Sequence, residues 1–123
     1  MAKTETIRWL EAPEEHDYPA AFSYLCLTFP PTAADAMVKK LRKAKPAAFK
    51  AKDIFRASGL SLLGVSNKHV LKDQEKIHDR IAIAPLLLVR QPALARVIIA
   101  DGYHRLCAVY SFDEDALIPC RIV

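Results

Sequence analysis

The spacing of apolar residues divides the chain into a helical amino half and a strand-rich carboxyl half. Up to residue 46, apolar residues recur three and four positions apart, which predicts two amphipathic helices. The first starts with Pro19 in its opening turn and runs to about Thr28, and the second runs from a Thr32 N-cap to about Lys45. Prolines at 30, 31 and 46 end these helices. The inward positions are Phe22, Leu25, Cys26 and Phe29 in the first helix, and Ala34, Met37, Val38 and Leu41 in the second.

Residues 47 to 66 fit two structures. One possibility is a short helix from Ala48 to Ala57, closed by Gly59. The other is a strand around Lys52 to Phe55, and we favour the helix. Ser66 or Asn67 then caps another helix. Its inward positions are Val70, Leu71, Ile77 and Ile81, and Lys68, Lys72 and Lys76 form a stripe on a different face.

The carboxyl half alternates strands with one helix. Leu86 to Arg90 and Arg96 to Ala100 are rich in aliphatic and β-branched residues and flank a turn, Gln91 to Ala95, that contains Pro92. A helix from Tyr103 to Phe112 and a closing strand from Ile118 to Val123 follow. The 123 residues therefore predict one α+β domain, with a helical part at 1–65 and a core at 66–123.

The junction of the second strand with the next helix has the composition of an anion site. Gly102 has no Cβ, so it permits close approach of a ligand to the backbone and a positive φ. His104 and Arg105 lie in the first helical turn, where free N–H groups and the helix dipole favour phosphate. Asp101 is the candidate catalytic residue, as a Mg²⁺ ligand or general base, with helix capping as the structural alternative. Two roles are open for Tyr103. Its phenol or ring face contacts a base or sugar, or its side chain packs on the core.

The roles of other charged residues depend on the tertiary structure. Lys72 and Lys76 are supporting cations if their helix lies beside the Gly102 corner, and solvated side chains otherwise. The spacing typical of a metal site is missing for His16, His69 and His78, so we expect these histidines to have structural roles. The adjacent His16 and Asp17 are expected to cap or pin the first segment.

The net charge of +4 is unevenly distributed. Residues 1–17 are acidic, with Glu5, Glu11, Glu14, Glu15 and Asp17 against Lys3 and Arg8. The basic segment 39–56 holds Lys39, Lys40, Arg42, Lys43, Lys45, Lys50, Lys52 and Arg56, with Asp53 as its one acid. Such a segment either contacts DNA phosphates or forms a solvated face that pairs with the acidic segment. Ala57-Ser58-Gly59-Leu60 also fits the turn of a helix-turn-helix.

Several classes of protein are disfavoured. The longest apolar stretch, Ile81 to Val89, is interrupted by Pro85, and the amino terminus shows no secretory pattern, so we expect a cytoplasmic protein with no membrane partner. Cys26, Cys107 and Cys120 are odd in number and widely spaced, which favours small buried hydrophobic residues over disulfides or zinc. The common Gly-rich nucleotide loops are missing from the sequence.

The carboxyl half resembles the ParB/sulfiredoxin superfamily of small α+β domains. The resemblance rests on residues 99–108, Ile-Ala-Asp-Gly-Tyr-His-Arg-Leu-Cys-Ala, and on residues 118–123, Ile-Pro-Cys-Arg-Ile-Val. It implies a small mixed sheet with packed helices, to which the amino half adds extra helices. In sulfiredoxins the corner reads Gly-Gly-Cys-His-Arg, where His and Arg meet ATP phosphates; His104 and Arg105 match these. Tyr103 replaces the reactive cysteine, so sulfinic acid reduction is not implied.

In chromosome-partition proteins the same corner is Gly-Glu-Arg-Arg-x-Arg and binds cytidine triphosphate. Here Tyr103 replaces the Glu, His104 the first Arg and Cys107 the third, while Arg105 retains the second. The helix before it also faces the nucleotide in such proteins, roughly at Lys72 and Lys76. The whole chain is similar to stand-alone bacterial ParB-like proteins through residues 15–21 and 52–60.

These observations predict a nucleotide- or phosphate-binding protein. Gly102, Tyr103, His104, Arg105, Lys72 and Lys76 would bind the ligand, expected to be ATP or another nucleotide with Mg²⁺, or a phosphorylated small molecule. If there is turnover, phosphoryl transfer or nucleotide hydrolysis fits, with Asp101 as the catalytic group. The alternatives are a DNA-associated, partition- or nuclease-like module that uses residues 39–56, and an interaction domain without a ligand.

Overall fold

The structure is a computed structural model that describes residues 6–64 and 66–123. Lys3 and Glu5 of the acidic segment lie outside the described residues. The helices are α1 (Asp17–Leu25), α2 (Pro31–Lys43), α3 (Ala51–Ser58), α4 (Lys68–His78) and α5 (Tyr103–Phe112). The strands are β1 (Ala47–Lys50), β2 (Leu86–Gln91), β3 (Arg96–Asp101) and β4 (Leu117–Ile122), with a short 3₁₀ helix at Pro92–Leu94 between β2 and β3.

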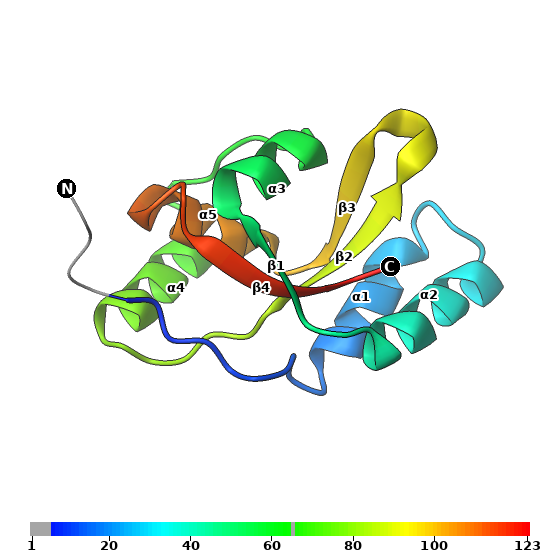
Figure 1. Cartoon of the computed structure of the whole chain (residues 1–123), viewed down its shortest axis with the longest axis horizontal. Coiled ribbons are helices and arrows are strands. Elements are labelled where there is room, and N and C mark those ends of the chain that lie inside the picture. Colours follow the sequence, from blue (N-terminus) through cyan, green and yellow to red (C-terminus); the bar gives the residue numbers. More distant parts are fainter. Residues whose placement is uncertain (1–5, 65) are drawn as a thin grey trace.

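These strands form one mixed sheet in the order β1-β4-β2-β3 (Figure 1). β2 pairs with β3 as an antiparallel hairpin and with β4 in parallel, and β1 pairs antiparallel with β4. The predicted α+β class is therefore confirmed, with a small mixed sheet and packed helices.

Helices cover both faces of the sheet, and the central strand β2 shows how. Leu86 and Leu88 belong to the core beneath α3, α4 and α5, whereas Leu87 and Val89 belong to the core beneath α1 and α2. Alternate residues of a strand point to opposite faces, so a strand covered on both sides is apolar throughout. All four of these side chains are accordingly buried.

The amino half is not purely helical, which corrects the division expected at residue 65. Residues 47–50 form the edge strand β1, with Ala47 opposite Cys120 and Phe49 opposite Ile118. Residues 52–55, the alternative strand, lie inside α3, and Gly59 closes that helix in the left-handed conformation at φ 69°. Four residues are too short for a strand pattern to stand out, and pairing with β4 decides their conformation.

Four smaller expectations were wrong. α2 begins at Pro31, because proline suits the first helical position, and Thr32 is therefore not its cap. Leu71 and Ile81 are 41% and 51% exposed, since α4 buries the stripe through Val70 and Ile77 and ends before Ile81. Residues 57–60 are not the turn of a helix-turn-helix, because α3 ends at Ser58 and α4 begins at Lys68, farther apart than the three or four residues of that motif.

Other local expectations hold. The inward positions Ala34, Val38 and Leu41 of α2 are buried, and Asn67 caps α4 by accepting hydrogen bonds from the N–H groups of His69 and Val70. Cys107 and Cys120 are buried free thiols, while Cys26 is half-buried and also free. Among the described residues no helix is long and apolar enough to cross a membrane.

Candidate functional site

The predicted corner forms at the carboxyl end of β3. The strand ends at Asp101, Gly102 follows at φ 107°, and α5 starts at Tyr103. The Gly102 carbonyl accepts the first bond of the helix from the Leu106 N–H, so the N–H groups of residues 103–105 precede the helical ladder. These groups and the helix dipole give this end of α5 a partial positive charge.

The requirement for glycine at position 102 has the expected cause of a positive φ and a second cause that the sequence did not predict. A Cβ built there would lie 2.8 Å from Leu86 Cγ and 2.9 Å from an Arg105 Nη atom. The space is thus already occupied by the protein's own side chains. Together with the positive φ, this close contact restricts the position to glycine.

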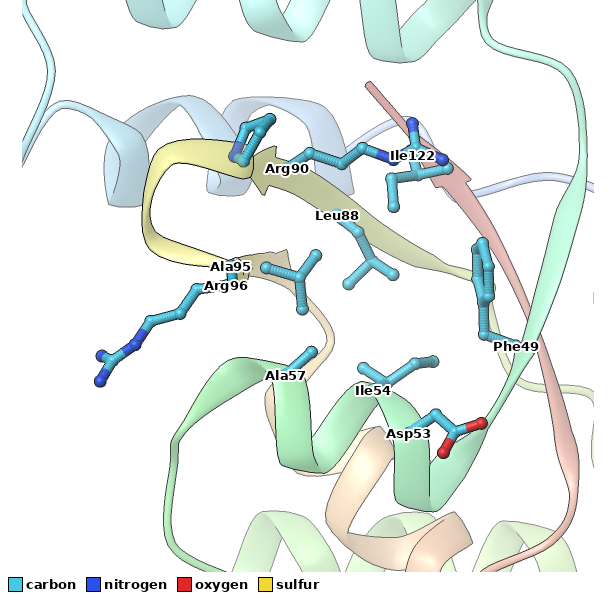
Figure 2. Close-up of a pocket in the computed structure, with 11 residues that line it drawn as sticks. Phe49, Asp53, Ile54, Ala57, Leu88, Arg90, Ala95, Arg96 and Ile122 are labelled. Atoms are coloured by element: carbon cyan, nitrogen blue, oxygen red, sulfur yellow. The ribbon is translucent and has the colours of Figure 1, made fainter.

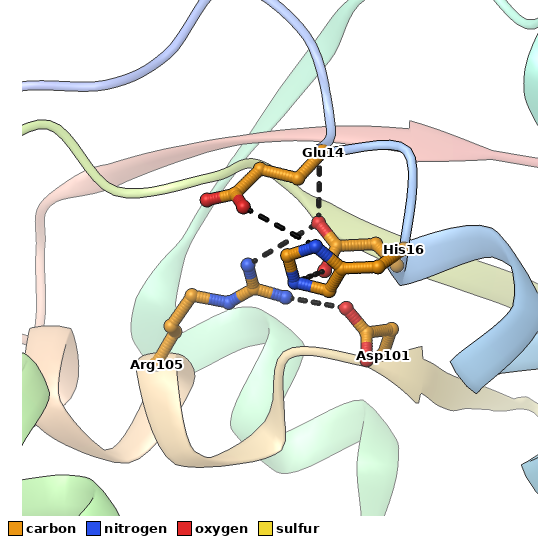
Figure 3. A network of polar contacts seen from close by, with 5 residues as sticks. Glu14, His16, Asp101 and Arg105 are labelled. Carbon is orange, nitrogen blue, oxygen red and sulfur yellow. Dashed lines mark hydrogen bonds and ion pairs between the residues drawn. The ribbon is translucent and has the colours of Figure 1, made fainter.

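Arg105 turns away from solvent and joins two carboxylates (Figure 3). Its Nη2 donates to Asp101 Oδ2 at 2.6 Å, and its Nη1 lies 3.6 Å from Asp17 Oδ2. The guanidinium side chain is only 14% exposed. Two carboxylates therefore balance its charge, and its role as a phosphate ligand stays a prediction.

Asp17 lies in the site, although the sequence predicted only that it would cap or hold the first segment. Its side chain is buried, accepts a hydrogen bond from the Glu14 N–H at 3.0 Å, and lies 3.4 Å from His16 Nε2. The other imidazole nitrogen of His16 lies 3.4 Å from Glu14 Oε2. This pinning is confirmed, and through Arg105 it fixes the start of α1 against the Gly102 corner.

Asp101 is held in an environment that favours its protonated form. Burial raises the pKa of this carboxyl to about 6, and the charge of Asp17 acts in the same direction, while Arg105 opposes both. A carboxyl with such a pKa changes its charge near neutral pH, which suits a proton donor or acceptor. The catalytic role of Asp101 stays a prediction.

Helix α4 brings a second group of side chains to the corner. His69, Lys72, Asp73 and Lys76 follow the spacing i, i+3, i+4, i+7, so they lie on one face of the helix. This face lines the same cleft as Asp101, Gly102, Tyr103, His104 and Arg105, with a volume of about 310 Å³. Tertiary packing thus brings together all seven residues singled out from the sequence.

The imidazoles of this group lie close together. The ring centroids of His69 and His104 are 4.9 Å apart. Burial lowers the pKa of His104, and the neighbouring His69 lowers it further, whereas Asp73 raises it. Burial likewise raises the pKa of Asp73, against the opposing charges of Arg105, Lys76 and the two histidines. His69 and Asp73 were missed, although their helical spacing with Lys72 and Lys76 was a usable signal.

Tyr103 has two contacts that define its position. Its hydroxyl donates to the Ser61 carbonyl, and its ring centroid lies 5.6 Å from that of His104. The hydroxyl therefore ties the segment after α3 to the first turn of α5. The ring still lines the cleft, so a contact with a base or sugar stays a prediction for the ring only.

The basic segment 39–56 does not form one surface. α2 packs on one face of the sheet and α3 on the other. Arg42 lies 2.7 Å from Glu15, with its guanidinium 4.2 Å from the Tyr18 ring centroid, and Lys39 pairs with Asp35. Lys52 and Arg56 pair with Asp115 and Asp53. The expected pairing with the acidic segment is thus seen at Arg42, while DNA binding stays a prediction.

Comparison of the chain with protein-family models, with curated proteins and with solved structures found no match. The ParB/sulfiredoxin resemblance therefore stays a prediction from the residues of the Gly102 corner. The class of protein that fold and site define is an α+β domain with a polar cleft at the carboxyl end of an edge strand.

Proposed function

We propose that the cleft binds a phosphate-bearing small molecule, and that a nucleotide is its natural ligand class. The observation that carries this proposal is the position of Lys72 and Lys76, which line the cleft together with the first turn of α5. Two cations from one helix therefore line the same cleft as the first turn of another, whose N–H groups precede the helical ladder. Phosphate oxygens accept hydrogen bonds from both kinds of donor.

The lining of the cleft carries both signs of charge, with the carboxylates of Glu14, Asp17, Asp73 and Asp101 and the cations Lys72, Lys76 and Arg105. An anionic ligand therefore depends on which of these cations are already paired. Among the described residues neither Lys72 nor Lys76 makes an ion pair, whereas Arg105 already faces Asp101 and Asp17. The cations without an ion pair therefore belong to α4, where Asp73 is the neighbouring carboxylate and interacts electrostatically with Lys76. His104 adds an imidazole that donates one N–H in its neutral form, which its lowered pKa favours.

A reaction, if the cleft carries one, would use Asp101 as the proton acceptor. Phosphoryl transfer and nucleotide hydrolysis need mainly positioning and charge neutralisation, which lysines and helical N–H groups supply. Magnesium would accompany the phosphates of such a nucleotide. The ParB/sulfiredoxin resemblance points to the same corner and the same ligand class, with His104 and Arg105 in the matching positions.

Calorimetric titration of ATP, CTP, ADP and inorganic phosphate, each with magnesium, tests the proposal. We expect saturable binding that Lys72→Gln with Lys76→Gln weakens at least about tenfold, because each lost charge-assisted hydrogen bond is worth about 1.5–3 kcal/mol. Lys40→Gln with Lys43→Gln removes the same charge from exposed positions of α2 and is the matched control. Absence of heat with every ligand, or equal binding by both double variants, would overturn the proposal.

The DNA alternative is separated by salt and by substitution. Replacement of Lys39, Lys40, Arg42 and Lys43 by Ala is expected to leave phosphate binding in the cleft unchanged. Affinity for duplex DNA that falls steeply with added salt and disappears in this variant would instead support a nucleic-acid function for α2.

A further inference from the structure

A second hollow, with a volume of about 390 Å³, lies between α3 and the β2–β3 hairpin (Figure 2). Its apolar lining comes from α3, from the sheet and from the edge strand β1: Ile54, Ala57, Leu88, Val97, Ile122 and Phe49. Phe49 is 37% exposed, which is unusual for a large aromatic ring beside a core. We call this hollow the apolar groove.

The apolar groove is separate from the polar cleft. Arg96 and Val97 at the start of β3 line the groove, whereas Asp101 at the end of β3 lines the cleft. With a rise of about 3.3 Å per residue, the two ends of this six-residue strand lie roughly 17 Å apart. A ligand in the groove therefore uses a different set of side chains from a phosphate in the cleft.

Two cations stand at the rim of the groove. Arg90 and Arg96 are exposed, and in the described part of the chain neither makes an ion pair. Figure 2 shows Arg90 extended beside Ile122 and Arg96 turned outward. The carboxylate of Asp53, which also lines the groove, lies 3.8 Å from Arg56 on the same helix. The free charge at the rim is consequently positive.

The size and lining of the groove limit its ligand. Small-molecule sites are usually hollows of about 300–1,000 Å³ with apolar walls and a few polar groups that fix orientation. Small residues, Ala57, Ala95 and Pro92, form part of the wall and leave room for an inserted chain. The charged side chains of the lining are those of Asp53, Arg90 and Arg96, and its other side chains are apolar.

We propose that the apolar groove binds a small amphiphilic carboxylate, such as a medium-chain fatty acid, with its tail over Leu88 and Val97 and its head at Arg90. The guanidinium of Arg90 provides the parallel N–H donors that a carboxylate accepts. Arg96 adds positive potential from farther away, because its guanidinium is turned outward beside Gly59 at the end of α3. Burial of the tail would cover Phe49 and the apolar floor.

Titration with octanoate, monitored by calorimetry and by amide chemical shifts, tests this proposal. We expect one saturable site, with the largest shifts at Phe49, Ala57 and Val97. Arg90→Gln with Arg96→Gln should weaken octanoate binding about tenfold or more, while Lys40→Gln with Lys43→Gln leaves it unchanged. Ala57→Leu keeps a good helix former in α3, fills the groove and should abolish binding.

Octanol and butyrate complete the experiment. Octanol has the tail without the charge and butyrate the charge with a short tail, so both should bind at least about tenfold more weakly than octanoate. Absence of octanoate binding, equal binding of octanol, or shifts that cluster around Gly102 would each overturn the proposal. Phosphate binding in the cleft is measured separately on the same groove variants, and its failure does not affect this result.

Discussion

At the scale of single residues, the Gly102 corner is a network in which each group depends on its neighbours. Gly102 leaves the space that Leu86 and Arg105 fill, and Arg105 holds Asp101 and Asp17 together. A substitution here therefore acts on stability as well as on any ligand. Predictions on these residues must separate the two effects.

Replacement of Gly102 by Ala is expected to lower the free energy of unfolding by about 1–3 kcal/mol, because φ 107° strains any residue with a Cβ and Leu86 lies 2.8 Å from its position. Urea denaturation measures the loss. Gly64→Ala is the control, since an added Cβ there would meet no atom of the described residues within 4 Å. Equal stability of the two variants would refute the argument.

Arg105→Ala is expected to cost about 2–4 kcal/mol of stability, because it leaves the partly buried Asp101 and Asp17 carboxylates without their cation. Arg105→Lys retains the charge and should recover part of the loss. Thermal and urea unfolding measure both variants. A loss below about 0.5 kcal/mol in Arg105→Ala would show that the pair contributes little, as exposed pairs do.

Asp101 should make stability depend on pH. Its pKa is about 6 in the folded state and near the ordinary 3.8 when unfolded, so the folded state holds a proton between these values that the unfolded chain has released. Its contribution is complete below about pH 4 and is lost as the pH rises through 6. Relative to Asp101→Asn, the wild type should lose unfolding free energy across this interval. Parallel pH profiles of the two proteins would contradict the assignment.

At the scale of elements, α4 supplies a large part of the charge in the cleft, because it carries His69, Lys72, Asp73 and Lys76. It is held by its cap and by contact with α5, through Val70 and Ile77. The face toward the cleft and the face toward the core are different stripes of the same helix. The apolar stripe of α4 packs on the core and sets the position of the helix. In this position the charged stripe lines the cleft.

Removal of the cap through Asn67→Ala should destabilise the protein by about 1 kcal/mol, because Asn67 Oδ1 accepts from His69 N at 2.9 Å and Val70 N at 3.3 Å. Asn67→Ser retains an acceptor and should be nearly neutral. Hydrogen exchange in the first turn of α4 should increase in the Ala variant only. Unchanged exchange there would show that packing alone holds this end.

At the scale of the whole molecule, the two halves of the chain share one sheet and one site. β1 pairs with β4, Asp17 approaches Arg105, and the Arg121 guanidinium donates to the Glu11 carbonyl at 3.1 Å. The face of β2 that carries Leu87 and Val89 is covered only by α1 and α2 among the described helices. The structure thus supports one cooperative unit.

A fragment of residues 66–123 should accordingly fail to fold alone, although it contains most of the sheet. It lacks β1, α1 and α2, and it would expose the apolar side chains of one whole face of β2. Circular dichroism and urea denaturation are expected to show no cooperative transition, in contrast to the full chain. Cooperative unfolding of the fragment would mean that the amino half is an addition to an independent core.

The sequence by itself determined most local structure and seven residues of the candidate site, although not Asp17, His69 and Asp73. Helical spacing predicted most helices, with α5 at its observed bounds, because this spacing reflects which face a helix buries. Runs of aliphatic and β-branched residues predicted the long strands. Gly102, His104 and Arg105 could be singled out since a strand-to-helix junction has recognisable residues.

Only the tertiary structure decided how these parts act on one another. The strand β1, the pairing of Arg105 with Asp17, and the position of Lys72 and Lys76 beside Gly102 all join residues far apart along the chain. Spacing along a sequence defines the faces of one element, whereas contacts between elements depend on packing and charge in three dimensions. For that reason the same Arg105 that resembles a phosphate ligand in the sequence is an ion-pair partner in the folded protein.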